Sequence, residues 1–545
     1  MIGEVSQLAN DFWILLAMVI YFAAMLSIGF IYSKRSNSSS KEYFAGGRGV
    51  GPWLTALSAE ASDMSGWLLM GLPGLAYFTG AADPMWTAIG LALGTYLNWK
   101  LVARRLRRYS VVAGDAITIP DFFAKRFHDK KGVVSTIAAV IILVFFSVYV
   151  GSCFVTVGKL FATLFGFDYH VMMIIGAVVV FVYTVVGGYL SVVMTDFIQG
   201  MLMFFALAVV FIGTVASAGG IDNTVEFLRA IPGYLSGTQV AAPKLDPATG
   251  QQLVEAGKAV FGAPSDYGII TIISMLAWGL GYFGMPQVLV RFLSIRSVEE
   301  VRKSRIIATS WCVISLGCAV CIGLVGRAMM PTELLTSTDA ETIFIVLAQT
   351  LLPSFMCGVV VSGIFAASMS SSSSYLIIGA SAMGENIFRG LLHRKATDKQ
   401  VMIVARVTLV VMFLFGILVA YDQNSSIFQV VSYAWAGLGA SFGPLMLCSL
   451  YWRRANKAGA AAVLIWHNLV KPLGGVFAIY ELLPAFIISL LFIVVVSLLT
   501  AKPNKRMLYE FDHYMDDPLP GTLPSGTVLV DEPMEAMESE VRSGK

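Results

Sequence analysis

The chain has 545 residues, of which 57% are hydrophobic and only 13% are charged. Soluble proteins carry about 25% charged residues, so this composition excludes a disordered chain, a fibrous repeat and a disulfide-rich secreted module, and it argues strongly against a large soluble enzyme. It is typical of a protein that crosses a membrane many times. The net charge of +3 is too small to indicate a nucleic-acid partner.

Thirteen apolar segments are long enough to cross a bilayer. The first follows the start MIGEVSQLAND, which has neither a basic region nor a cleavage site, so it is predicted to be a retained span. The predicted spans are 12–33, 52–80, 85–103, 132–162, 170–188, 196–217, 267–290, 306–328, 342–380, 400–420, 427–451, 458–480 and 483–501. A polar loop over about 218–266 separates the sixth span from the seventh.

An odd number of spans places the two termini on opposite sides of the membrane. If the N-terminus is outside, nearly every lysine and arginine falls on the inner side, which is the positive-inside pattern. We therefore predict a multi-pass plasma (inner) membrane protein with a cytoplasmic C-terminus. Residues 1–501 are predicted to form the membrane transport domain. Residues 502–545, which are rich in proline and acids, are predicted to form a mostly disordered cytoplasmic tail.

Two spans are interrupted by glycine and proline. Span 52–80 contains WLTALSAEASDMSGWLLMGLPGLAYF, and span 267–290 contains IISMLAWGLGYFGMPQVLV. Backbone groups freed by such residues survive at membrane depth only where they line a cavity or bind something. Two breaks at matching positions indicate a transporter with two inverted repeats, here about 52–217 and 267–451. The alternative for each break is close helix packing or a simple kink.

Polar side chains inside spans are costly and therefore indicate function. Asp63 lies beside the first break, where it could attract a cation or bond to the backbone. Glu60, one turn earlier, could join a cation site or face the inner vestibule. Ser370 to Ser374 are five consecutive serines within the ninth span. Their hydroxyls can bond back to their own helix, or they can join freed carbonyls in binding a small cation such as sodium.

Other candidate residues have two interpretations each. Asp196 lies in GGYLSVVMTDFIQG, where the sixth span begins, and is expected to cap that helix or to take part in gating. Arg48, just before the second span, is expected to anchor the chain at the inner surface or to act in coupling. The aromatic side chains of Tyr149, Trp278 and Tyr282 lie near mid-membrane, where they either pack or line a pocket.

Four motifs make the chain similar to a known family. They are GGRGVGPWLTALSAEASDMSGWLLMGLPG, GGYLSVVMTDFIQG, WGLGYFGMPQVLVRF and the serine-rich ninth span. They resemble the solute:sodium symporter family, and the first and third resemble its proline-transporting branch. The resemblance implies an all-α polytopic fold with thirteen transmembrane helices and a LeuT-type 5+5 inverted-repeat core, in which helices 2 and 7 are broken. It also implies coupled uptake of sodium and L-proline.

The resemblance further implies roles for individual residues. Sodium would be bound by oxygens of Ala61, Met64, Ala367, Ser370 and Ser371. Asp63 would support high sodium affinity. L-Proline would be recognised by Ser65, Gly66, Tyr149, Trp278, Tyr282 and Pro286. Arg48 would act in coupling and Asp196 in gating. Glu60 stands where the family commonly has glycine, which leaves the effect of its charge on ion affinity open, whereas Ser371 stands where threonine is common and keeps the hydroxyl.

The alternatives are sodium symport of another small amino acid or a monocarboxylate, or a sensor with a transport fold and no net flux. A channel is disfavoured because no filter motif is present, and an enzyme because no nucleophile–base pair or metal cluster is visible. The six cysteines lie in apolar runs, and the five histidines show no metal-binding spacing. We expect no cofactor besides co-transported sodium. The expected partners are Na+, L-proline and the lipid bilayer, with no obligate protein partner.

Overall fold

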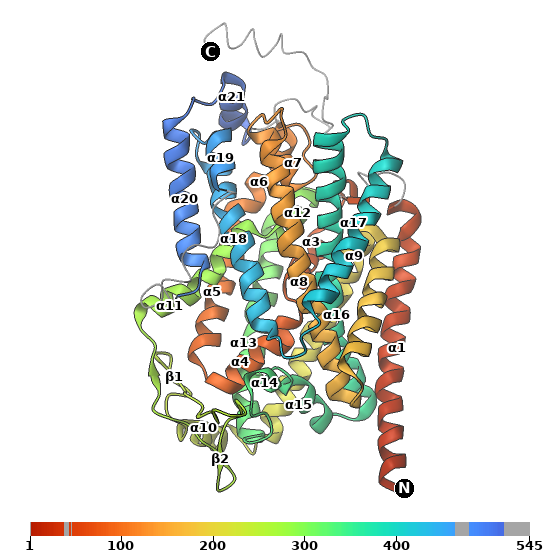
Figure 1. Cartoon of the computed structure of the whole chain (residues 1–545), viewed down its shortest axis with the longest axis vertical. Coiled ribbons are helices and arrows are strands. Elements are labelled where there is room, and N and C mark those ends of the chain that lie inside the picture. The colour runs from red at the N-terminus through yellow and green to blue at the C-terminus, as the bar shows by residue number, and fades with distance from the viewer. Residues whose placement is uncertain (1, 37–42, 45, 464–478, 517–545) are drawn as a thin grey trace.

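The computed structural model describes residues 2–36, 43–44, 46–463 and 479–516, which form an elongated bundle of helices (Figure 1). Within these residues, eight helices are long and apolar enough to cross a membrane, and a ninth span is added if the bent pair Ile269–Gly284 and Pro286–Ser294 counts as one. The prediction of a mostly helical, multi-span membrane protein is therefore confirmed, while the count of thirteen stays a prediction.

The first half of the chain is helical almost throughout. Its helices are α1 (Ile2–Ser36), η1 (Gly46–Arg48), α3 (Pro52–Asp63), η2 (Trp67–Gly71), α4 (Leu72–Thr79), α5 (Ala82–Asn98), η3 (Trp99–Ala103), α6 (Arg104–Val112), α7 (Ile119–Arg126), α8 (Val133–Phe165) and α9 (Tyr169–Ser217). α3 begins at Pro52, where the missing N–H is not needed. Gly188 divides α9, because its φ of 66° is left-handed and interrupts the helix between the predicted fifth and sixth spans.

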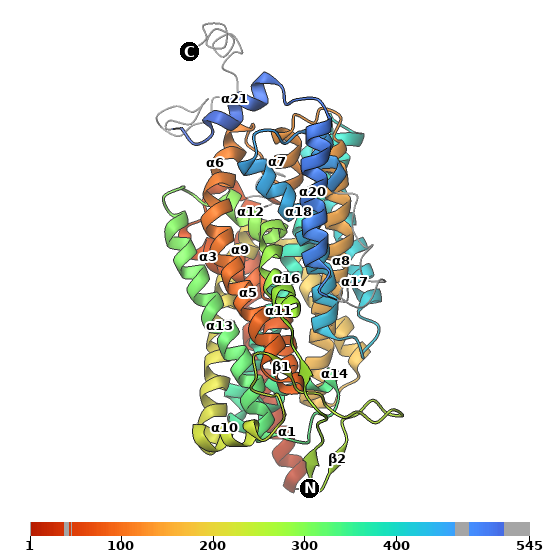
Figure 2. The same cartoon turned by 90° about the vertical axis from the view of Figure 1, so that its left-hand side faces the viewer.

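The polar loop after α9 is folded. It contains α10 (Ile221–Arg229) and the short strands β1 (Gln239–Val240), β2 (Val254–Glu255), β3 (Lys258–Ala259) and β4 (Ser265–Asp266). β1 pairs with β4 and β2 with β3, both antiparallel. Figures 1 and 2 place this loop at the lower end of the molecule, opposite α21. The buried Arg327 side chain holds the loop to the bundle by donating a 2.7 Å hydrogen bond to Gln252.

The second half follows the loop. Its helices are α11 (Ile269–Leu276), η4 (Ala277–Gly284), α12 (Pro286–Ser294), α13 (Val301–Met329), α14 (Ser337–Ala340), α15 (Ile343–Leu351), α16 (Ser354–Ser381), η5 (Ala382–Leu392), α17 (Asp398–Val419), α18 (Ile427–Tyr451), α19 (Lys457–Val463), α20 (Leu482–Leu499) and α21 (Lys505–His513). Most of the predicted twelfth span, 458–480, lies outside the described residues. α1 begins at the lower end of the bundle, whereas α21 lies at the upper end (Figure 1).

Two boundaries differ from the prediction. The ninth span was expected over 342–380, but α15 ends at Leu351 and a new helix starts after Pro353, which cannot continue a helix from the preceding turn. This new helix continues through η5 to Leu392. The segment predicted as a mostly disordered tail from residue 502 contains the helix α21 near its start. Tyr514, just after α21, stacks on Tyr109 of α6 with ring centroids 4.6 Å apart.

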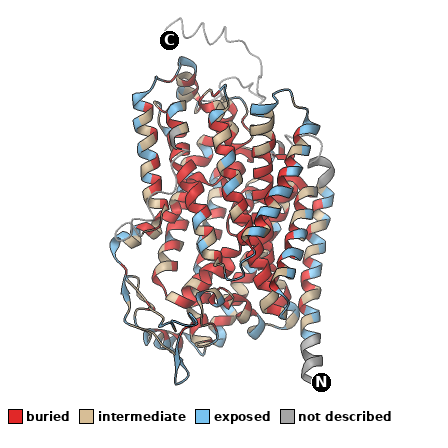
Figure 3. Cartoon of the chain, in the orientation of Figure 1, coloured by how far each residue is buried: buried red, intermediate tan, exposed pale blue. Residues whose placement is uncertain are grey.

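α16 runs through the centre of the bundle. Every residue from 360 to 382 is buried, and Figure 3 shows the buried residues concentrated in the middle of the molecule. α16 packs against α1, α3, α8, α9 and α17. Small residues allow this close packing, since a Cβ on Gly358 would lie 2.6 Å from the Ile14 carbonyl oxygen. The five consecutive serines of α16, Ser370 to Ser374, are therefore enclosed by protein on all sides.

Candidate functional site

The first helix break opens the backbone near the middle of the bundle. α3 ends at Asp63, Met64 has non-helical angles (φ −81°, ψ 76°), and η2 begins at Trp67. Gly66 lies directly against α8, because a Cβ at this position would come within 2.3 Å of the Thr156 side chain. The break therefore places irregular backbone, of the kind that lines a binding cavity at membrane depth, directly beside α8.

The second break lies between η4 and α12. The segments Ile269–Gly284 and Pro286–Ser294 are bent by 44°. Met285 is extended (φ −79°, ψ 107°), and Pro286 forms the first residue of α12, a position that needs no N–H. Gly281 in η4 has no room for a side chain, because a Cβ would lie 2.0 Å from the Trp435 ring nitrogen. A glycine at 281 thus lets α18 approach the break.

Oxygen atoms from both α3 and α16 meet beside the first break. The Ser370 hydroxyl donates to the Ala61 carbonyl oxygen at 2.7 Å and contacts the Ala367 carbonyl oxygen at 3.1 Å. The Ser371 hydroxyl is buried and has no hydrogen-bond partner among the described residues, and Met64 lies in the break itself. Buried hydroxyls are nearly always partnered, so Ser371 offers an oxygen to a ligand.

The other serines of the run have different partners. The hydroxyls of Ser372 and Ser373 donate to the carbonyl oxygens of Ser368 and Ser370 within their own helix. The hydroxyl of Ser374 accepts a 2.7 Å hydrogen bond from Arg291 of α12. The run is thus divided into residues that face the break, residues that bond to their own helix and one residue that faces α12.

Two carboxylates lie close to the break. Asp63 accepts a 3.0 Å hydrogen bond from the side chain of Gln287, so it faces α12. The Tyr282 hydroxyl lies near the same carboxyl and has no hydrogen bond of normal geometry to a described residue. Glu60 is fully buried near Trp99 and Asp63, and one of its oxygens lacks a partner within the described part of the chain. Neither carboxylate bonds to the serines of α16.

Aromatic rings surround the second break. Trp278 stacks on Tyr480 with centroids 4.8 Å apart and on Trp67 at 5.8 Å. Tyr282 meets Trp435 edge-on at 5.1 Å. Trp278 and Tyr282 are only 2% and 1% exposed, so the surrounding side chains shield both rings from solvent. This ring cluster joins the two breaks, because Trp67 follows the first and Trp278 precedes the second.

Tyr149 links α8 to this region. Its ring packs against Tyr375 of α16 at 4.5 Å and its hydroxyl lies beside Ser65. The residues for which the resemblance implies substrate contacts are therefore gathered around the two breaks: Ser65, Gly66, Tyr149, Trp278, Tyr282 and Pro286. Tyr480 and Trp435 could not be identified from the sequence, because their proximity to the breaks depends on the packing of α18 and α20.

The oxygens of Ala61, Ala367, Ser370 and Ser371 beside the first break form an oxygen cluster. A buried ion pair joins four helices next to this oxygen cluster. Arg291 of α12 lies 2.9 Å from Asp196 of α9, and both side chains are at most 1% exposed. Ser58 of α3 donates to Asp196 at 2.7 Å and accepts from Arg291 at 3.0 Å, while Ser374 connects the pair to α16. Because Ser58 precedes Ala61 on α3, the pair lies between the oxygen cluster and the start of α3.

The ion pair corrects two interpretations of the sequence. Asp196 does not cap a helix, because α9 resumes after Gly188 and Asp196 lies about two turns inside it. Arg291 follows the predicted seventh span and counts among the arginines expected on the inner side, but it is buried within the bundle. A signal for its position was present in the sequence: Gln287 and Arg291 are four residues apart, so they share one polar face of α12.

Arg48 connects separate segments at the upper end of the bundle. It pairs with Asp115 at 2.9 Å and donates to the Ser110 hydroxyl at 3.0 Å and the Ala116 carbonyl oxygen at 2.9 Å. Burial lowers the pKa of the Arg48 guanidinium, and the Asp115 carboxylate opposes that shift. Its φ of 56° is unusual for a residue with a side chain. Arg48 thus holds η1 to the connection between α6 and α7.

A second buried ion pair lies on the opposite side of the ring cluster. Lys159 of α8 and Glu341 are 2.7 Å apart and are 7% and 3% exposed. The Glu341 carboxylate also accepts from the Ser426 hydroxyl at 2.8 Å and from the backbone N–H of Phe428 at 3.2 Å, which places a negative charge at the N-terminus of α18. Phe428 packs on Trp278 at 5.4 Å. The pair therefore covers the ring cluster on the side of the folded loop.

Replacing Glu341 by glutamine is expected to destabilise the protein by about 3 kcal/mol, because it leaves the Lys159 charge buried without a counter-charge. The measurement is thermal unfolding of the purified protein. Glu333→Gln is the matched control, because Glu333 lies in the same connection but is exposed. Equal unfolding midpoints for the two variants would contradict a structural role for the pair.

Comparisons with known proteins agree with this architecture. A model of the sodium:solute symporter family matches residues 43–466. The osmoregulated proline transporter OpuE of Bacillus subtilis (strain 168) is 40% identical over 502 residues, which is 90% of this chain and 96% of the relative. The sodium/proline symporter of Staphylococcus aureus (strain JH9) is 40% identical over 514 residues, which is 92% of this chain and 95% of the relative.

Solved structures share the fold. A Na+-coupled sialic acid symporter in a substrate-bound, outward-open state superposes with a TM-score of 0.72 at 20% identity, covering 90% of this chain and 99% of that one. MHP1, a nucleobase-cation-symport-1 family transporter, gives a TM-score of 0.50 at 13% identity, covering 88% and 99%. At these identities the structures support the fold alone. The family match spans most of the chain, and this protein belongs to the sodium:solute symporter family.

Proposed function

We propose that this protein couples the inward movement of sodium ions to the uptake of L-proline. The observation that carries this proposal is the 40% identity, over at least 90% of the chain, to relatives named sodium/proline symporter and proline transporter. The two helix breaks, the oxygen cluster and the ring cluster support it, because together they offer a site for a small cation and a site for a small amino acid. The protein is therefore proposed to be a transporter without a cofactor, not an enzyme.

Sodium is proposed to bind at the oxygen cluster, to Ala61, Met64, Ala367, Ser370 and Ser371. Hard oxygen ligands suit such a cation. The Ser370 hydroxyl, which donates to the Ala61 carbonyl, would turn its hydrogen away so that both oxygens face the ion. Asp63 would add negative potential nearby and would thereby raise sodium affinity. The unpartnered Ser371 hydroxyl supports this assignment.

L-Proline is proposed to bind between the two breaks. Its carboxylate would lie beside Ser65 and Gly66 at the N-terminus of η2, where the helix dipole favours a negative charge. Its apolar ring would pack on Trp278 and Tyr282. Tyr149 and Pro286 complete the proposed site. Because these side chains are buried in the closed structure, the rings must separate to admit the substrate.

Alternating access is proposed to involve the two buried ion pairs. The Lys159–Glu341 pair would close the outer side of the bundle. The Asp196–Arg291 pair would close the inner side, which would be the gating role of Asp196. Arg48 would act in coupling by connecting the segments at the inner side. The thirteen-span topology, the LeuT-type 5+5 repeat, the broken helices 2 and 7 and an external N-terminus are part of this proposal. The start of α1 and α21 lie at opposite ends of the bundle, which supports termini on opposite sides of the membrane (Figure 1). A membrane potential would supply about 2.3 kcal/mol per charge per 100 mV.

Replacing Trp278 by alanine is expected to weaken proline binding about thirtyfold, because loss of a central aromatic contact costs about 2 kcal/mol. Sodium affinity should change much less, since Trp278 lies in the ring cluster and not among the serines of α16. Binding of radiolabelled proline to purified protein at several sodium concentrations measures both effects. Trp13→Ala is the control, because Trp13 is 48% exposed on α1. Unchanged proline affinity in Trp278→Ala would remove this ring from the substrate site.

The decisive experiment is uptake of radiolabelled L-proline into proteoliposomes that contain the purified protein. An inward sodium gradient is compared with an equal potassium gradient at a clamped potential. Accumulation that requires sodium is the expected result. If folded protein transports proline with neither gradient, the proline assignment is wrong, and other small amino acids and monocarboxylates should be tested in the same vesicles. Binding without flux of any of these solutes would support a sensor.

A further inference from the structure

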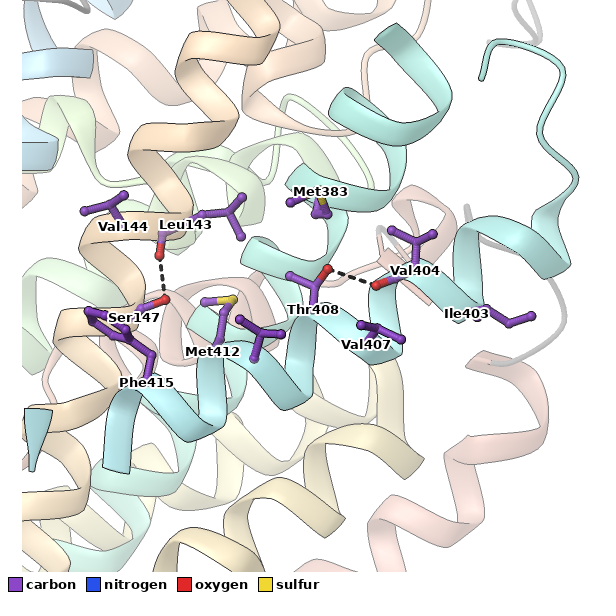
Figure 4. A pocket seen from close by; sticks show the side chains of 11 residues that line it. Leu143, Val144, Ser147, Met383, Ile403, Val404, Val407, Thr408, Met412 and Phe415 are labelled. Carbon is purple, nitrogen blue, oxygen red and sulfur yellow. Dashed lines mark hydrogen bonds between the residues drawn. The ribbon is translucent and has the colours of Figure 1, made fainter. Parts of the chain in front are cut away.

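An apolar groove lies on the side of the bundle, away from the helix breaks. It has a volume of about 510 Å³ and is lined by residues of α8, α17 and the segment η5 (Figure 4). Only two of its side chains carry hydroxyls, and both are satisfied within their own helices. Ser147 donates to the Leu143 carbonyl at 2.6 Å, and Thr408 donates to the Val404 carbonyl at 2.9 Å (Figure 4). The groove therefore offers a purely apolar surface to its occupant.

The groove opens toward the surroundings of the bundle. Val144, Val407 and Val411 line it and are 53%, 58% and 60% exposed. On α17 it extends from Ile403 to Phe415, which corresponds to about 18 Å of helix at ~1.5 Å per residue. The hydrocarbon of one leaflet is about 15 Å thick, half of a ~30 Å bilayer core. The groove therefore has the length and the polarity of a lipid acyl chain.

Exposed cations gather at one end of this groove. α8 begins directly after Lys130 and Lys131, η5 ends directly before the segment with Arg394 and Lys395, and α17 carries Lys399 in its first turn. Arg394 donates to the Lys130 carbonyl oxygen at 2.9 Å, which joins the two connections. All three elements that line the groove thus bring positive charge to the same end.

The acids at this end are paired with other cations. Glu385 and Asp398 both contact Arg389, and Asp129 contacts Lys457. Lys399 lies one helical turn before Ile403, the first groove residue on α17. The exposed cluster of Lys130, Lys131, Arg394, Lys395 and Lys399 therefore has a net positive charge next to the mouth of the groove.

We propose that the groove and this cluster form a binding site for an anionic phospholipid of the surrounding bilayer. One acyl chain occupies the groove, and the phosphate lies beside Lys395 and Lys399. Cations placed at the membrane surface next to an apolar cleft recognise such headgroups by charge complementarity. Since η5 continues directly from α16, the helix with the serine run, a bound lipid also restrains the end of α16 against α8 and α17.

The test uses the full-length protein, purified in mild detergent and stripped of lipid. Phosphatidylglycerol or phosphatidylcholine with identical acyl chains is added, and bound lipids are counted by native mass spectrometry. We expect phosphatidylglycerol to bind at a concentration at least about fivefold lower than the concentration at which phosphatidylcholine binds. Lys395→Gln/Lys399→Gln should abolish this difference. Arg302→Gln/Lys303→Gln should keep it, because these residues are equally exposed in the first turn of α13.

A second pair of variants tests the groove itself. Val407→Trp should fill it and lower binding of both lipids, whereas Val313→Trp should not, because Val313 is 51% exposed on α13, outside the groove. Equal affinity of the unmodified protein for the two lipids would overturn the proposal, as would unchanged binding in Val407→Trp. A dimer that dissociates in Val407→Trp would also overturn it, because a second copy of the chain would then occupy the groove.

Discussion

Replacing both Ser370 and Ser371 by alanine is expected to raise the sodium concentration for half-maximal proline uptake about a hundredfold. Each hydroxyl that contacts a charged ligand contributes about 1.5 kcal/mol, and two such losses correspond to two powers of ten. Ser370 already bonds to the Ala61 carbonyl oxygen at 2.7 Å, so removing its hydroxyl also removes a contact between α16 and the break. The measurement is sodium-dependent uptake into proteoliposomes.

The matched control is Ser372→Ala. Its hydroxyl is equally buried in the same run, but it bonds to the Ser368 carbonyl of its own helix. The control should transport with nearly normal sodium dependence. The double variant could instead be produced in smaller amounts while its folded fraction keeps a normal sodium dependence. In that case the two hydroxyls are structural and the proposed sodium site is wrong.

The second large effect is expected at the buried pair of Asp196 and Arg291. Arg291→Met should destabilise the protein by about 3–5 kcal/mol, because it leaves the Asp196 carboxylate charged and unpaired in the core. Adding Asp196→Asn should recover part of this loss, because the double variant buries no net charge. Thermal unfolding of the two single variants and the double variant measures the interaction.

An exposed ion pair provides the comparison for this result. Glu300→Gln removes the partner of Arg296, which is 60% exposed, and should cost less than about 1 kcal/mol. A double variant that is less stable than both single variants would contradict the explanation by unpaired charge. It would instead indicate that the hydrogen bonds to Ser58 and Ser374 stabilise this region more than charge balance does.

The sequence predicted those features that depend on local chemistry. The irregular backbone at Met64 and the bend before Pro286 lie in the two segments that the glycines and prolines of the sequence mark as interrupted. The polar character of the serine run was equally visible in the sequence, and so was the length of the apolar segment in each predicted span. Pro353 likewise marks the interruption between α15 and α16 in the sequence. Because apolar residues lie on both sides of it, the two helices were predicted as one span.

Features that depend on partners distant in sequence could not be predicted. Arg291 and Asp196 are 95 residues apart, and Lys159 and Glu341 are 182 apart. A charge near the end of a span is usually a surface residue, so only the packing of four helices reveals that Arg291 is buried. Similarly, the acids and prolines of 518–545 dominated the interpretation of the tail, although α21 precedes them.

The ring cluster around Trp278 has a practical consequence. Tryptophan emission responds to the polarity and the neighbours of the indole, and here Trp67, Trp278 and Trp435 lie in one buried group. If the substrate separates Trp278 from these rings, the unlabelled protein carries its own optical reporter of occupancy. The kinetics of gate opening could then be followed by stopped-flow fluorescence, and Trp13, exposed on α1, would contribute only a constant background.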